Sequence, residues 1–156
     1  MRDVHSVTIR VFAKPEEDAS KILEGLKALI PFDLEEEKVK IEVDRALGFN
    51  ERVIQVFTVR LKKASHTNAF LKFLKEKLGR KQCELLYAQK ESRFDEDEFA
   101  FFIRALKPAW IEKRNLVLTD SGNCYHIRLQ LAAYPRKKEV AMERVKKLFK
   151  FDNSRS

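Results

Sequence analysis

The stretch from Phe99 to Pro135 limits the possible folds more than any other part of the chain, because it carries the densest β signal. Its extended runs are Phe99–Leu106, Asn115–Thr119 and Cys124–Leu131, and the tight turn Asp120–Asn123 separates the last two. The two long runs are apolar at alternate positions, with Arg104 and Arg128 in the opposite phase. Successive side chains of a strand point to opposite faces of a sheet. The stretch therefore predicts a sheet with one face in a core and a basic, partly aromatic face turned outward.

The rest of the chain predicts further strands and helices around this sheet. Alternation predicts strands over 5–13, 39–43 and 52–63, and apolar positions at helical spacing predict helices over 15–30, 65–78, 81–90 and 136–150. Residues 107–114 are expected to form a loop, and 151–156 a polar tail. We expect a single α+β domain over residues 1–156, because no linker or repeat divides the chain. Its architecture is predicted to be a two-layer sandwich, in which helices pack on one face of a mostly antiparallel mixed sheet and the other face stays open.

The charge balance favours a polyanionic partner. The chain has 32 lysines and arginines against 24 aspartates and glutamates, a formal net charge of +8. Neutralising phosphates with such cations releases counterions, which is the general source of nucleic-acid affinity. The alternative is that the charge serves solubility alone. Charged residues make up 36% of the chain, with four glycines and four prolines, and this composition is typical of a thermophilic protein with many surface ion pairs and short loops.

Nothing in the sequence predicts export or a membrane location. The N-terminus has no apolar signal region, and no apolar run is long enough to span a bilayer. Cys83 and Cys124 lie far apart, without the spacing of a zinc site or a disulfide framework. We therefore expect a reduced, cytoplasmic protein with no metal, no cofactor and no membrane partner.

The outward phase of four predicted strands collects the candidate RNA-binding side chains. They are Arg10, Arg60, Lys62, Phe102, Arg104, His126 and Arg128. Arginine suits phosphate because its planar fork binds two oxygens at once, and an aromatic ring among arginines can stack on an unpaired base. Two structural alternatives stay open: a solvated sheet face whose arginines pair with carboxylates, or a face buried against a partner subunit.

Two other basic segments are candidates for the same role. The predicted loop contributes Lys107, Trp110, Lys113 and Arg114, with Trp110 as a stacking platform beside phosphate contacts. The favoured alternative places this tryptophan at the end of the core with its indole N–H satisfied. The C-terminal helix contributes Arg136, Lys137 and Lys138, which could contact phosphates without reading sequence. Its alternative is the solvated face of an amphipathic helix.

A catalytic signature is missing from the sequence. The acidic clusters over 35–37 and 95–98 could hold magnesium for nuclease chemistry, but a solvated loop explains them better, since no histidine is placed with them as a base. The phosphate-loop and dinucleotide fingerprints are absent, as are the GXXG loop of KH domains and the Gly-aromatic signature of RRM domains.

Several segments together resemble a known family. They are Val7–Arg10 leading into Pro15–Asp18, Gly48–Asn50 after a strand, and Phe101–Lys107 followed by an aromatic residue, a hairpin and a basic helix. The pattern, over about residues 4–149, is similar to the archaeal family of predicted exosome-subunit RNA-binding proteins. The resemblance implies a fold similar to the ribosomal protein that binds 5S rRNA, and RNA binding in RNA processing or degradation. Leu106 and Pro108 depart from this pattern, where an acidic residue and a glutamine are common.

The sequence thus predicts a non-enzymatic RNA-binding protein, an accessory factor that works with RNA-processing or exosome proteins. One alternative is an assembly subunit that docks on a partner or forms a homodimer through the sheet face. The other is a metal-dependent nuclease. Which RNA is bound, and whether it is single- or double-stranded, does not follow from the sequence.

Overall fold

The computed structural model describes residues 2–151, apart from the side chain of Phe49. The strands are β1 (Val4–Ala13), β2 (Ile41–Leu47), β3 (Val53–Leu61), β4 (Phe94–Asp95), β5 (Ala100–Leu106) and β6 (Cys124–Leu131). The helices are α1 (Ala19–Ala28), α2 (Ala64–Ala88), α3 (Lys107–Lys113) and α4 (Lys138–Phe149), and a 3-10 turn, η1 (Phe49–Glu51), joins β2 to β3. Most of the predicted tail, residues 152–156, lies outside the described residues.

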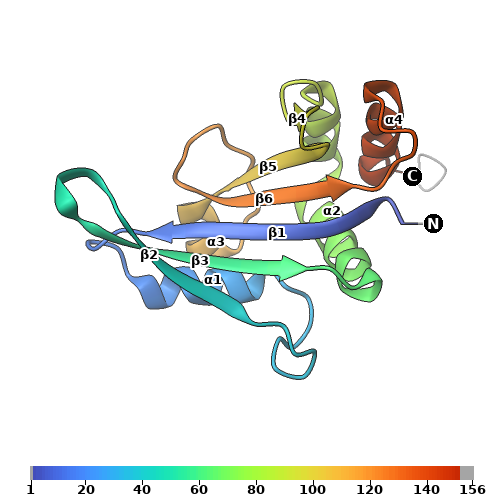
Figure 1. Cartoon of the computed structure of the whole chain (residues 1–156). Coiled ribbons are helices and arrows are strands. Elements are labelled where there is room, and N and C mark those ends of the chain that lie inside the picture. Colours follow the sequence, from blue (N-terminus) through green and yellow to red (C-terminus); the bar gives the residue numbers. More distant parts are fainter. Residues whose placement is uncertain (1, 152–156) are drawn as a thin grey trace.

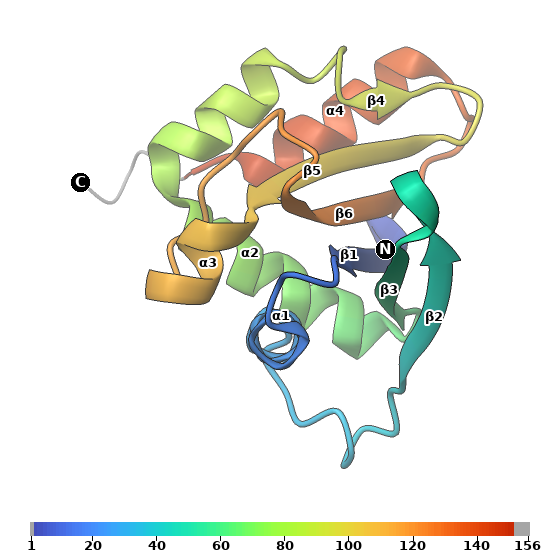
Figure 2. The ribbon, with the colours of Figure 1, turned by 90° about the vertical axis from the view of Figure 1, so that its left-hand side faces the viewer.

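The strands form one sheet in the order β2-β3-β1-β6-β5-β4, and every pairing in it is antiparallel. All the helices lie on one side of this sheet, and the other side is uncovered (Figures 1 and 2). The predicted two-layer α+β sandwich is confirmed. No described helix combines the length and the apolar character that a membrane span needs.

A row of branched aliphatic side chains crosses the covered face of the sheet. The strand register aligns Ile41, Val59, Ile9, Ile127 and Ile103 on β2, β3, β1, β6 and β5. The four members on β3, β1, β6 and β5 are fully buried. Branched side chains are stiff and fill a pleated surface well, so this row gives the helices a continuous apolar surface to pack on.

The predicted pair of helices and the predicted run over 115–119 differ from the structure, and each difference has a local cause. The helices predicted over 65–78 and 81–90 are one helical segment, α2, which breaks where Gly79 adopts φ 77° and ψ 171°. Only glycine reaches that backbone region without strain, so the predicted break point is confirmed. The run Asn115–Thr119 is not a strand of its own, since only Leu118 bridges to β5. Two backbone hydrogen bonds join the run to β5. Gln82 also holds its backbone, because its side-chain amide donates to the Leu116 carbonyl oxygen at 2.6 Å and accepts from the Leu118 N–H at 2.9 Å.

The predicted loop over 107–114 is wrong, because residues 107–113 form α3 with Pro108 in its first turn, where a missing N–H costs nothing. Trp110 is buried in the core, where its Nε1–H donates to the Gly25 carbonyl oxygen at 2.7 Å. The stacking platform predicted at Trp110 is therefore wrong, and the core alternative is confirmed.

Lys107 is buried as well, at the start of α3. Its ammonium donates to the Phe12 carbonyl oxygen at 2.7 Å and pairs with Glu17 at 3.2 Å. Burial alone would raise the pKa of Glu17, but the Lys14 backbone N–H and the Lys107 ammonium hold that pKa below its ordinary value. Lys107 therefore ties α3 to the end of β1 and offers no free cation to RNA.

Helix α1 lies close to the core at Gly25. A methyl group added there would lie 2.2 Å from the hydroxyl oxygen of Tyr125, which donates to the Ile22 carbonyl oxygen at 2.7 Å. We expect Gly25→Ala to lower the free energy of unfolding by about 1–3 kcal/mol, although alanine favours a helix, because overpacking outweighs propensity. Urea denaturation measures this change.

The matched control is Gly122→Ala. No atom lies within 4 Å of a methyl group added at Gly122, so the substitution should leave stability nearly unchanged. An equal effect of the two substitutions would contradict the close approach of α1 to β6.

Candidate nucleic-acid interface

Two rows of polar side chains cross the open face of the sheet, one residue out of phase with the buried aliphatic row. The first row runs Glu42, Thr58, Arg10, His126, Arg104 over β2, β3, β1, β6 and β5. The second runs Arg60, Thr8, Arg128, Phe102 over β3, β1, β6 and β5. Each of these four strands therefore contributes one arginine to a single surface, which faces the viewer in Figure 1.

Between the two rows lies a hollow of about 320 Å³. Its lining is Thr8, Arg10, Arg60, Glu98, Phe102, His126 and Arg128. We call this set the arginine hollow. Glu98 belongs to the loop between β4 and β5, so the edge of the sheet contributes one carboxylate to the rim.

The arginines of the face differ in how far they are neutralised. Arg60 is hydrogen-bonded to Glu42, and Arg128 lies 3.7 Å from the carboxylate of Glu98. Arg104 donates to the Asp120 carbonyl oxygen at 3.0 Å, which orients its guanidinium without neutralising it. Arg10 has no hydrogen bond or ion pair with any residue in the described part of the chain. The central strand thus carries the cation that is most available to an incoming anion.

His126 lies between cations on three strands. Burial, and then the charges of Arg104, Arg10 and Arg128, lower the pKa of its imidazole from the ordinary value. The ring is therefore neutral near pH 7, with one nitrogen as donor and the other as acceptor. Its centroid is 5.3 Å from that of Phe102, and the two half-buried rings are tilted by 39°. Together they form a small aromatic surface among the arginines of the open face.

The other predicted site residues lie elsewhere. Lys62 follows β3 at the margin of the open face and is exposed. Lys113 and Arg114 end α3, on the covered side of the sheet (Figure 2). Arg114 caps this helix by donating to the carbonyl oxygens of Trp110 and Ile111 at 2.8 and 2.9 Å. These two cations are therefore not part of the arginine hollow.

Arg136, Lys137 and Lys138 lie where β6 passes into α4, and none of them lines the hollow. Arg136 stands over the ring of Phe99 at 5.0 Å, and Lys138 is 3.9 Å from a carboxylate oxygen of Glu91. The structure therefore separates this basic segment from the sheet-face residues.

Two residues that line the hollow, Thr8 and Glu98, were not among the predicted site residues. Thr8 shares the outward phase of Arg10, a signal that was available in the alternation of β1. Glu98 gave no such signal, because it lies in an acidic loop whose path depends on the tertiary structure. Within residues 2–151 as described, no three His, Cys, Asp or Glu side chains are grouped so that they could hold a metal ion.

Comparison with known proteins gives the family. A family model described as RNA binding matches residues 6–131. The chain belongs to this RNA-binding family. RNA-binding protein PAB1135 from Pyrococcus abyssi (strain GE5 / Orsay) is similar to it, with 28% identity over 143 residues that cover 91% of each chain. The resemblance seen in the sequence is thereby confirmed at the level of an RNA-binding family with archaeal members.

Solved structures of archaeal proteins share the fold. Protein AF2318 from Archaeoglobus fulgidus, of the family DUF54, superposes with a TM-score of 0.82 at 28% identity, covering 93% of this chain and 99% of that one. Mth689, a DUF54 protein from Methanothermobacter thermautotrophicus, gives 0.76 at 26% identity, covering 96% of this chain and 100% of that one. The fold is thus shared over 93% and 96% of this chain.

The titration of His126 tests the electrostatics of the arginine hollow. We expect an NMR titration to give a pKa below the ordinary value of about 6.5, because burial and the neighbouring arginines disfavour the imidazolium. The unfolded chain then takes up a proton at higher pH than the folded one. Folding stability should therefore fall as the pH drops below about 6.5.

His126→Gln keeps a polar side chain of similar reach and cannot titrate. This variant should lose the corresponding part of the pH dependence of stability. A pKa at or above the ordinary value would contradict the placement of His126 among the three arginines.

Proposed function

We propose that this protein is a non-enzymatic factor that holds an unpaired segment of RNA on the open face of its sheet. The observation that carries the proposal is the arginine hollow, where cations from neighbouring strands surround an aromatic pair. Membership of an RNA-binding family supports the choice of RNA among polyanions. Unpaired bases can reach and stack on side chains of a sheet, whereas bases within a duplex are stacked on each other, which favours a single strand.

We propose that some residues of the hollow supply affinity for RNA and that others position its bases. Arg10 and Arg128 suit phosphate oxygens, since each guanidinium can bind two oxygens at once. They lie on the adjacent strands β1 and β6, where Arg10 is paired with His126 and Arg128 with Thr8. Phe102 with His126 offers a ring surface for one base. The neutral imidazole can also donate to, or accept from, a base edge or a 2′-hydroxyl. Glu98 and Glu42 hold two of the arginines in place before RNA arrives.

The role that we propose for this binding is accessory. The protein would hold RNA in the cytoplasm for the enzymes of RNA processing or degradation, with exosome proteins as partners, as the sequence resemblance implies. The sheet face itself offers binding groups, and we assign it no step of bond cleavage.

The double variant Arg10→Gln, Arg128→Gln tests the sheet face. We expect its affinity for a single-stranded RNA to fall roughly tenfold to a hundredfold, and the slope of log affinity against log salt to decrease by one to two. Melting should stay nearly unchanged, because both side chains lie on the open face and only one has a carboxylate partner, at 3.7 Å. Fluorescence anisotropy across a salt series measures both quantities.

The matched control removes the same charge from the helix layer. Lys72 and Lys81 of α2 are exposed and have no ion pair with a described residue. Lys72→Gln with Lys81→Gln should change RNA affinity less than about twofold, beyond the loss of general charge attraction. Equal losses in the two double variants would mean that net charge, and not the arginine hollow, carries the binding.

Docking on a partner is a second candidate function, and one surface favours it. Val43, Leu47 and Val53 of the β2–β3 hairpin are 54%, 77% and 47% exposed. The order of strands places β2 at the edge of the sheet, so its outer backbone groups could pair with another strand. The homodimer considered from the sequence would fit this edge better than the arginine-rich face.

Light scattering tests self-association through this edge. If it forms a homodimer, the protein should have twice the chain mass at high concentration, and Leu47→Glu should return it to a monomer without changing RNA affinity. A wild-type protein that stays monomeric at millimolar concentration would rule out this docking mode.

A further inference from the structure

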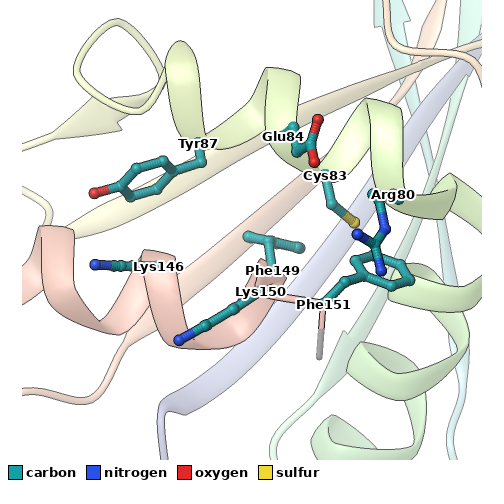
Figure 3. A pocket seen from close by; sticks show the side chains of 8 residues that line it. All are labelled: Arg80, Cys83, Glu84, Tyr87, Lys146, Phe149, Lys150 and Phe151. Atoms are coloured by element: carbon teal, nitrogen blue, oxygen red, sulfur yellow. The ribbon is translucent and has the colours of Figure 1, made fainter. Parts of the chain in front are cut away.

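A cleft on the helix layer, between α2 and α4, has no part in the sheet-face site. Its volume is about 230 Å³ (Figure 3). Tyr87 and Glu84 come from α2 on one side of it, and Lys146 of α4 and Lys150, the residue after α4, lie on the other side (Figure 3). Because α2 and α4 cover the opposite side of the sheet from the arginine hollow, the two sites are separate (Figure 2).

Aromatic rings make up the apolar surface of the cleft. Phe149 is buried at 4% exposure and lies between the two helices, whereas Tyr87 and Phe151 are half-buried. Cations already stand on these rings: Lys75 and Arg80 lie 5.1 and 5.7 Å from the ring centre of Phe151, and Lys90 lies 4.1 Å from that of Tyr87. The rings are thus set in a positively charged surrounding, which attracts an anionic ligand.

The charges at the opening have the same sign. Lys146 and Lys150 are exposed, and neither has an ion pair with a described residue. Among the described residues of the lining, Glu84 is the one carboxylate, against Arg80 and the two lysines. It cannot hold a phosphate, but it can accept hydrogen bonds from the exocyclic amino group of a base.

We propose that this cleft binds a nucleotide, with the base against Tyr87 and the phosphate at Lys146 and Lys150. Pockets for drug-sized ligands measure about 300–1,000 Å³, so a smaller cleft suits a single base with its phosphate outside. A free mononucleotide and one nucleotide of an RNA strand offer the same chemistry. The proposal does not depend on RNA binding at the sheet face.

The test is a titration with adenosine 5′-monophosphate, followed by the backbone amide signals of the protein. We expect saturable shifts at residues 83–87 and 146–151. Lys146→Gln with Lys150→Gln should weaken binding about tenfold, since two charge-assisted contacts are lost. Tyr87→Leu should weaken it about fivefold or more, by removing a stacking partner. Adenosine without phosphate should bind as weakly to the wild type as the monophosphate does to the lysine variant.

Two control variants separate this site from the sheet face. Lys72→Gln with Lys81→Gln removes two charges from α2 outside the cleft and should bind the monophosphate like the wild type. Arg10→Gln with Arg128→Gln should do the same, even if it abolishes RNA binding. A short oligoadenylate then tells the two possible ligands apart. If it shifts the same amides and competes with the monophosphate, the natural ligand is a nucleotide of an RNA strand. If it does neither, the natural ligand is a free nucleotide. The proposal fails if these amides do not shift at millimolar monophosphate, or if the lysine variant binds it like the wild type.

Discussion

The register of the antiparallel strands determines both the core and the candidate interface. It aligns a row of aliphatic side chains, centred on Ile9 and Ile127, against the helices. Strand periodicity then turns the neighbouring residues, Arg10 and His126, to the uncovered side. A slip of one residue in either strand would bury a guanidinium and expose an isoleucine, so the free energy that stabilises the core also holds the interface in place.

This coupling explains how so many arginines can share one surface. Like charges in neighbouring rows repel, and the fold offsets part of this repulsion with Glu42 and Glu98. Arg10 is left without such a partner in the described structure, and the pKa of His126 is lowered by burial and the nearby arginines. An RNA phosphate would relieve both effects. We therefore propose that part of the binding energy comes from relief of the repulsion between these cations when a phosphate binds.

Features that depend on strand periodicity could be predicted from the sequence, and features that depend on tertiary contacts could not. Alternation was enough to assign Arg10 and Phe102 to the outward face and to give the fold class. The same alternation places Lys107 in the inward phase with Ile103, a sign of burial that its charge obscured. Its partner Glu17 lies 90 residues away, so the pair could not be foreseen. The path of residues 115–119 was also out of reach, because it depends in part on the side chain of Gln82, a distant residue on α2.

Ultraviolet crosslinking of a uridine-rich single strand, with mapping of the crosslinked residues by mass spectrometry, tests the central claim most directly. A base stacked on the aromatic pair must lie in contact with β5 and β6. We therefore predict crosslinks at Phe102 or His126 that disappear in high salt. Crosslinks confined to α1, α3 or the β2–β3 hairpin, with none on β5 or β6, would contradict the assignment of RNA binding to the open face.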